Sequence, residues 1–234
     1  VLMVAFVVIG TILDMMHKKS AKYFFLNAEK AKKNAKRQVG AGEKIAIATK
    51  VLVVEVATSG EFKNVKRRLS HLLTMWGTVI FVATTAILIF AYPTPATPTP
   101  GVLAALWYIG ALLVCLGGYW FWFFIRVDVS AEGNSPWRLV RADLFILSLL
   151  ASVTLGLVWA ASGGGAGVLF GLYILATTVL FAGVPWSKFA HMFFKPAAAF
   201  EKRVSAANGF RNRLPAPSDK PEQFGSARTQ PRHY

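Results

Sequence analysis

Residues 102–125 read VLAALWYIGALLVCLGGYWFWFFI, and this stretch contains no Asp, Glu, Lys or Arg. It is part of a longer uncharged run, because none of these four residue types occurs between Arg68 and Arg126. A second uncharged run lies between Asp143 and Lys188. A water-soluble domain of ordinary size cannot bury two such runs, whereas a bilayer accepts about 20 apolar residues per crossing. The sequence therefore predicts an all-α integral membrane protein.

The composition of the whole chain agrees with this class. Of its 234 residues, 55% are apolar and only 16% are charged, whereas soluble domains are nearer a quarter charged. Secreted, fibrous and disordered chains are thereby excluded. The single cysteine, Cys115, lies inside an apolar run, so the chain can hold neither an internal disulfide nor an iron–sulfur cluster of its own.

Five membrane crossings are predicted from the apolar stretches. They are residues 1–16, 70–92, 102–125, 142–162 and 166–190. The first lacks the basic leading segment and small-residue cleavage site of a signal peptide. We therefore interpret it as a crossing whose beginning is missing from the sequence.

The loop charges predict the orientation of the bundle. The chain carries 26 basic and 11 acidic residues. The basic residues gather in segment 17–69, in loop 126–141 and in the tail from Lys188, whereas loops 93–101 and 163–167 carry none. Because basic loops stay in the cytoplasm, we expect the N-terminus outside, the C-terminus in the cytoplasm, and a multi-pass protein of the inner or plasma membrane. Segregation of this kind indicates topology rather than nucleic-acid binding.

The cytoplasmic segments suggest contacts with lipid or with a partner protein. The basic loop 17–69 contains a Lys- and Ala-rich stretch, 20–38, that we expect to be helical. Segment 43–58 has apolar residues on most sides, and two interpretations stay open: an amphipathic helix lying in the lipid interface, or a packing helix under a partner subunit. Residues 1–200 would form the membrane domain. Residues 201–234 would form an extended cytoplasmic tail that contacts or leads into an iron–sulfur partner, since such tails usually clasp a neighbour or are disordered.

Three of the four histidines are predicted to lie at one depth on three different helices. His17 ends the first crossing, His71 begins the second and His191 ends the fifth. Two histidines at matched depth on facing helices are what a non-covalently bound b-type haem requires. The alternative is that each is an interfacial polar residue at a helix end. Gly77, with three glycines on the third crossing, would admit a flat macrocycle or another helix.

Further ionisable residues fall at the same level. Arg68, Arg141 and Lys188 are candidates to pair with haem propionates, although the positive-inside rule alone would explain them. Asp14 and His17 are three residues apart and share a helix face. They are candidates for delivering protons to a membrane quinone, or else form a structural hydrogen-bonded pair.

Other catalytic classes have little support. The sequence contains neither an HExxH nor a GxSxG pattern, and no glycine-rich phosphate loop follows a strand. A small-solute transporter is also disfavoured, because no repeated halves with broken helices are evident.

Three short motifs resemble a known family. They are residues 68–77 (RLSHLLTMWG), 141–145 (RADLF) and 184–193 (VPWSKFAHMF). They resemble the membrane cytochrome b family that includes the gamma subunit of respiratory nitrate reductase and the membrane subunits of heterodisulfide reductases. The likeness is greatest to heterodisulfide-reductase-related iron–sulfur oxidoreductases, some of which pass electrons from electron-transferring flavoprotein to menaquinone.

The resemblance implies the ligand set and the partners. In the family, the second and fifth crossings supply haem-ligating histidines, and His71 and His191 fall on those motifs. The nitrate reductase type has two histidines on each helix and two haems, whereas here each helix has one, so one haem b is expected unless His17 joins a second site. Iron–sulfur clusters would lie in a cytoplasmic partner or in a segment that follows residue 234.

The sequence thus favours a haem b subunit of a quinone-linked oxidoreductase rather than a complete enzyme. Its expected partners are a cytoplasmic iron–sulfur subunit or domain, a quinone of the menaquinone kind, electron-transferring flavoprotein and membrane lipid. The rival hypothesis is a cofactor-free membrane anchor that holds a cytoplasmic complex.

Overall fold

The computed structural model describes residues 2–18, 20–60, 62, 64–94, 96–126, 137–139, 143–187 and 191–210, except for a few side chains within helices, those of His17 and His191 among them. The described chain is helical and contains no strand.

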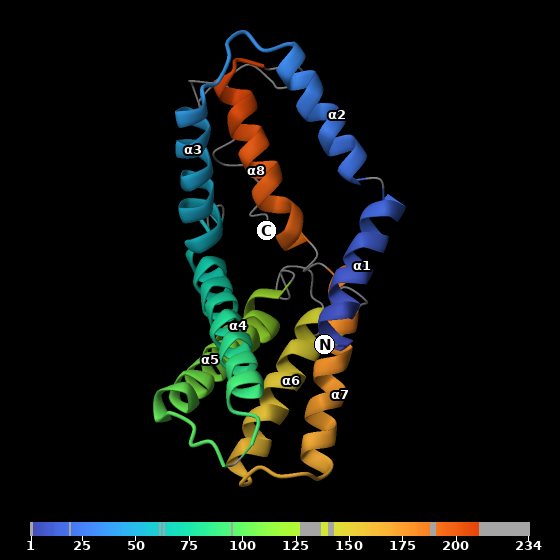
Figure 1. Cartoon of the computed structure of the whole chain (residues 1–234), viewed down its shortest axis with the longest axis vertical. Coiled ribbons are helices and arrows are strands. Elements are labelled where there is room, and N and C mark those ends of the chain that lie inside the picture. Colours follow the sequence, from blue (N-terminus) through green and yellow to red (C-terminus); the bar gives the residue numbers. More distant parts are fainter. Residues whose placement is uncertain are drawn as a thin grey trace.

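Within the described residues, four helices are long and apolar enough to cross a membrane (Figure 1). They are α4 (Val65–Ala91), α5 with its π-helical end η2 (Gly101–Trp120 and Phe121–Ile125), α6 (Leu144–Ala161), and α7 with the 3₁₀ turn η5 (Val168–Gly183 and Val184–Trp186). Each matches one of the predicted crossings from the second to the fifth. The fold is therefore that of a multi-pass helical membrane protein.

Helix α1 (Leu2–Lys18) is shorter in its apolar part. That part, Leu2–Asp14, rises about 20 Å at 1.5 Å per residue, against a hydrocarbon thickness of about 30 Å. The helix packs against α7 and η5, and a Cβ on Gly10 would come within 2.6 Å of Pro185 Cγ. The first predicted crossing, residues 1–16, thus stays a prediction.

Helices α4 and α5 touch through glycines. A Cβ on Gly77 would lie 2.7 Å from the Val114 amide nitrogen, and one on Gly110 would lie 2.7 Å from the Phe81 amide nitrogen. A Cβ on Gly117 would lie 2.7 Å from the Ser70 carbonyl oxygen. Small residues let apolar helices approach this closely. Of the two interpretations of these glycines, close helix packing is therefore the one found at these three positions, and a macrocycle has no room there.

Adding a methyl group at this contact will destabilise the bundle. Gly77→Ala must push backbone apart, and we expect a loss of about 1–3 kcal/mol, typical of overpacking. Gly171→Ala is the matched control, since a Cβ there meets nothing within 4 Å. Thermal unfolding in detergent, followed by the reactivity of Cys115 with a thiol dye, measures both. Equal melting temperatures for the two variants would contradict the assignment.

The remaining spans are joined by aromatic packing and by hydroxyl pairs. One buried apolar cluster contains residues of α4, α5, α6 and α7; its members are Phe81, Trp107, Ala111, Val114, Leu149, Val153, Tyr173 and Leu180. Tyr119 pairs with Thr154 at 2.8 Å, and Ser152 pairs with Thr177 at 2.6 Å. Such interhelical hydrogen bonds hold helices together where lipid competes for the apolar surface.

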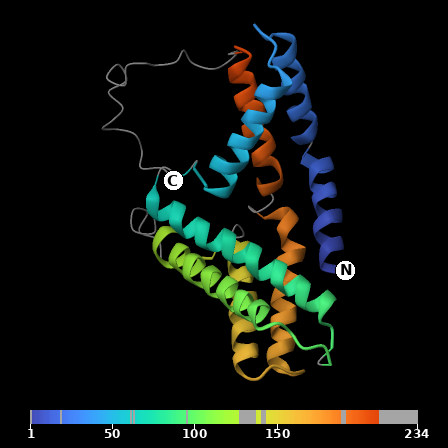
Figure 2. The same ribbon diagram turned by 60° about the vertical axis from the view of Figure 1, so that its left-hand side comes forward.

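A second layer of helices rises from one end of the spans. It consists of α2 (Ser20–Lys33), α3 with its π-helical end η1 (Ala41–Lys50 and Val51–Ala57), and α8 (His191–Ala207). Figures 1 and 2 show α8 beside both α2 and α3, with all three pointing away from the spans. The segment predicted at 43–58 therefore packs on α8 and does not lie across the ends of the spans, as an interfacial helix would.

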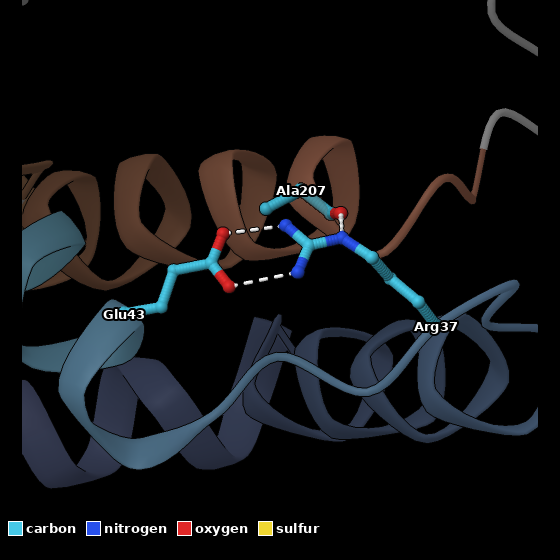
Figure 3. Close-up of polar contacts among 3 residues, drawn as sticks. All are labelled: Arg37, Glu43 and Ala207. Atoms are coloured by element: carbon cyan, nitrogen blue, oxygen red, sulfur yellow. Dashed lines mark hydrogen bonds and ion pairs between the residues drawn. The ribbon is translucent and has the colours of Figure 1, made fainter.

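Arg37 connects α3 to α8 at the end of this layer that lies farthest from the spans (Figure 3). Its guanidinium forms two hydrogen bonds with the Glu43 carboxylate, at 2.9 and 2.5 Å, and its Nε donates to the Ala207 carbonyl oxygen at 2.7 Å. The hydrogen bond to Arg37 lowers the pKa of Glu43. Because the last carbonyls of a helix have no partner within it, Arg37 caps α8 while tying α3 to it.

Candidate functional site

His71 lies on α4 about two turns from its start, where the spans meet the second layer. Its Nδ1 is 2.9 Å from the Ser59 hydroxyl oxygen. The Phe62 ring lies against the imidazole, with the ring centroids 4.9 Å apart. Ser59 is buried and His71 is half-buried. These two contacts therefore fix both the position of the imidazole and the orientation of its ring.

The loop that carries Ser59 is fixed by side chains of α4. Trp76 Nε1 donates to the Ala57 carbonyl oxygen at 3.0 Å, and Arg68 Nε donates to that of Thr58 at 2.8 Å. Gly60 N–H returns to the Val54 carbonyl oxygen at 2.7 Å. The last carbonyl oxygens of a helix have no N–H partner within it, and these bonds provide donors for the carbonyls near the end of η1. The same helix thus supplies His71 and positions its neighbour.

The start of α4 is set by Asn64. Its side-chain oxygen accepts hydrogen bonds from the amides of Lys66 and Arg67, at 3.0 and 3.3 Å, as an N-cap does. Arg67 also reaches the Ile125 carbonyl oxygen at the end of η2, at 3.4 Å. The helix therefore begins five residues before the predicted crossing and brings its basic residues into contact with both π-helical ends.

His191 occupies a different helix from the one predicted. The predicted crossing 166–190 ends at Trp186, and His191 is the first residue of α8. Its side chain lies outside the described part of the chain. Lys195, one turn further along α8, has its Nζ 6.0 Å from the centroid of the Phe62 ring. Phe62 thus lies close both to His71 on α4 and to Lys195 on α8.

Of the three residues predicted to pair with haem propionates, the structure describes one. Arg68 lies beside His71 on α4 and bonds the Thr58 carbonyl through Nε. A guanidinium carries five N–H donors, so this bond leaves it capacity for an acid group. Arg141 and Lys188 lie outside the described residues.

Asp14 lies on α1, the helix that packs against α7 and η5, and it is 6% exposed. The Thr11 hydroxyl, three residues earlier on the same helix face, is buried and forms no hydrogen bond with the described residues. The side chain of His17 lies outside the described part. The structure thus shows a buried carboxylate on α1, and both its predicted part in a proton path and its pairing with His17 stay predictions.

Two features of the site were missed in the sequence. Ser59 is one, and only the turn composition of Thr58-Ser59-Gly60 hinted at a fixed loop. The other is an ion pair between Arg126 and Asp143, with 2.8 Å between its closest N and O atoms. These two residues bound the uncharged runs on either side of one loop, and their opposite signs could have indicated a pair.

Comparisons with known proteins add no relative. No family model, no curated protein and no solved structure matches the chain. Among the described residues, no group of three or more His, Cys, Asp or Glu side chains is arranged to hold a metal ion. A haem needs only two imidazoles from the protein, so this finding does not bear on the predicted pair of His71 and His191.

Proposed function

We propose that the chain is the haem b-containing membrane subunit of an electron-transfer oxidoreductase. The observation that carries the proposal is the hydrogen bond between Ser59 and Nδ1 of His71. Histidines that bind a metal nearly always engage their second ring nitrogen in this way, which fixes the tautomer and the ring orientation. His71 would then bind iron through Nε2, and His191 on α8 would supply the second axial nitrogen.

The arrangement around this site supports a cytoplasmic position for the haem. Helices α2 and α3 and the connection between them carry eight of the 14 basic residues of segment 17–69, so the positive-inside rule favours a cytoplasmic position for this layer. In this proposal α1 is the first of five crossings, with its N-terminus outside, and the protein belongs to the inner or plasma membrane. His71 then lies on the side from which iron–sulfur clusters of a partner would deliver or accept electrons.

The residues have separate duties in this proposal. The haem, when bound, supplies one-electron chemistry. His71 and His191 hold it, Ser59 orients His71, and Arg68 provides a cation for an acid group. Asp14, with His17, would exchange protons with a quinone of the menaquinone kind at the α1–η5 contact. Electron-transferring flavoprotein would be a soluble donor to the assembly.

A difference spectrum of the purified protein tests the function. The dithionite-reduced minus air-oxidised spectrum in detergent should show a b-type haem, with about one haem per chain. About two haems would bring His17 into the ligand set and overturn the single-site assignment. Absence of haem from a folded protein, after expression with added haem precursor, would contradict the proposal as a whole.

A membrane anchor without a cofactor is the second candidate, because one face of α3–η1 is suited to a partner protein. Apolar side chains are exposed along it, and Ile45 is 67% and Leu52 57% exposed. Lys44 and Lys50 are exposed on the same helix. Both acids of the segment are tied inward, Glu43 to Arg37 and Glu55 to Arg203.

This face favours an acidic protein surface with an apolar centre. A second copy of the chain would bring lysine against lysine, which is repulsive. A bilayer is disfavoured because α3 rises away from the spans (Figure 2). An apolar patch rimmed by charge of one sign is typical of a protein interaction site.

Reversing the charge of this face should release the partner. We expect Lys44→Glu/Lys50→Glu to abolish a larger complex seen by native gel electrophoresis of host membranes in mild detergent. Lys22→Glu/Lys30→Glu on α2 is the matched control and should retain it, because these lysines lie on another helix. Equal behaviour of the two double variants would exclude α3–η1 as the docking face.

A further inference from the structure

We propose that Ser59 is a positioning residue that accepts a hydrogen bond from Nδ1 of His71 and thereby tunes the redox potential of the bound haem. The inference rests on the proposed function and extends it to a residue outside the predicted ligand set. It is carried by the contact of 2.9 Å between the Ser59 hydroxyl and Nδ1 of His71, and by the way in which the loop presents that hydroxyl.

The loop holds Ser59 in a conformation that must be maintained by its surroundings. Its φ is +49°, in the left-handed region, and it is the only described residue other than glycine with a positive φ. Such a conformation is uncommon for a residue with a Cβ and persists where the surrounding structure enforces it. Here the flanking carbonyls of Ala57 and Thr58 are bonded to Trp76 and Arg68, and Ser59 itself is 1% exposed.

The direction of the hydrogen bond decides whether His71 can bind iron. If Nδ1 carries the proton and donates it to the serine oxygen, Nε2 keeps its lone pair for the metal. If the serine donates to Nδ1 instead, a neutral ring carries its proton on Nε2 and cannot ligate. Iron binding therefore selects the first arrangement, in which the serine oxygen accepts.

An accepting partner on Nδ1–H also makes the ligand a better electron donor. Such partners raise the basicity of the metal-binding nitrogen, and their loss lowers metal affinity by about 10–100-fold. A more basic imidazole favours ferric over ferrous iron, so removal of the hydroxyl should raise the midpoint potential. Each tenfold loss of ferric relative to ferrous affinity corresponds to about 59 mV for one electron.

Three variants separate this role from a purely structural one. Ser59→Gly removes the hydroxyl and suits a positive φ, so it should not strain the loop. Ser59→Asn keeps a side chain that can accept a hydrogen bond and tolerates the left-handed region. Ser70→Ala is the control: this serine is also buried and adjacent to His71, but its hydroxyl donates to the Gly117 carbonyl at 2.8 Å.

The first measurement is a potentiometric titration followed by haem absorbance. We expect Ser59→Gly to raise the midpoint potential by about 59 mV or more, Ser59→Asn to restore part of the shift, and Ser70→Ala to leave the potential unchanged. An unchanged potential in Ser59→Gly, with haem fully bound, would overturn the role of Ser59 and leave the haem proposal intact.

The second measurement needs no haem. In the haem-free protein, ¹⁵N NMR of the imidazole distinguishes protonation of Nδ1 from that of Nε2. We expect the tautomer populations of His71 to differ between the wild-type protein and Ser59→Gly, because the hydroxyl engages Nδ1 as either acceptor or donor. The same tautomer in both proteins would refute the inference, whereas a wild-type protein that binds no haem in the optical experiment would refute the proposed function instead.

Discussion

Replacing either proposed axial ligand is expected to remove the haem almost completely. His71→Ala and His191→Ala should each reduce bound haem from about one per chain to a small residue, because a macrocycle without covalent attachment depends on both axial bonds. The loss would be read as the reduced-minus-oxidised absorbance per purified chain. His233→Ala is the matched control, a histidine of the tail that no haem model uses, and it should retain full absorbance.

Loss of a ligand must be distinguished from loss of the fold. His71→Ala leaves the buried Ser59 hydroxyl without its imidazole, which costs about 1–3 kcal/mol. Far-ultraviolet circular dichroism will show whether the helices persist. Added imidazole provides a second check, since it can enter the space left by the side chain and restore the spectrum only where a ligand is missing. Full haem retention in both variants, with helices intact, would refute the ligand pair.

The membrane-spanning part of the fold could be predicted because hydrocarbon thickness leaves few choices. Stretches without charge and of sufficient length must be helices that cross or lie buried, and α4, α5, α6 and α7 correspond to such stretches. The glycines were harder, since spacing alone does not distinguish a macrocycle from a neighbouring helix. The contact of Gly77 with the Val114 backbone depends on which helices are neighbours, and no single-helix pattern contains that information.

Helix ends were predicted less well than helix centres. The predicted fifth crossing continued to residue 190, whereas the structure ends it near Pro185 and starts α8 at His191. Proline fixes φ and lacks an N–H, so a change of helix there is physically reasonable, but apolar composition continues across it. His191 consequently belongs to a helix of the second layer, although its sequence position next to the span was correctly noted.

Ser59 could not have been found from helical periodicity. It lies twelve residues from His71 and follows a π-helical segment, Val51–Ala57, whose turn differs from 3.6 residues. A pattern based on the α-helical repeat therefore loses its register before the loop. Segment 43–58 shows the same limit: its apolar residues fitted either a lipid interface or a packing helix under a partner subunit. The salt bridge of Glu55 with Arg203, which turns one face toward α8, could not be read from them.

Breaking the ion pair of Arg126 with Asp143 is expected to lower the stability of the protein more than breaking an exposed ion pair. Both side chains are less than a tenth exposed, at 6% and 8%. The guanidinium carbon lies 3.9 Å from the centroid of the Trp122 ring, and Nη2 also donates to the Arg138 carbonyl. Taking both charges out of water is costly, and the pair is favourable only while each charge compensates the other.

Removal of one partner is therefore expected to cost more than removal of both. Asp143→Ala should lower the free energy of unfolding by about 3–5 kcal/mol, because it leaves the Arg126 guanidinium with less compensation in a secluded site. Arg126→Met/Asp143→Leu should recover much of that loss, since apolar side chains of similar volume carry no charge to desolvate. Thermal unfolding in detergent, followed by the reactivity of Cys115, gives both values.

An exposed pair on α2 provides the comparison. Glu29 and Lys33 are one turn apart with 2.7 Å between Oε1 and Nζ, but their side chains are 57% and 73% exposed. Because water already compensates such charges, Glu29→Ala should change the melting temperature little. If Asp143→Ala proved no more damaging than Glu29→Ala, the pair would be incidental. A double variant less stable than Asp143→Ala would mean that Arg126 acts mainly through Trp122 and the Arg138 carbonyl. We expect Asp143→Ala to be the least stable of the three variants. That order follows only if the buried ion pair is what holds the end of η2 to the start of α6.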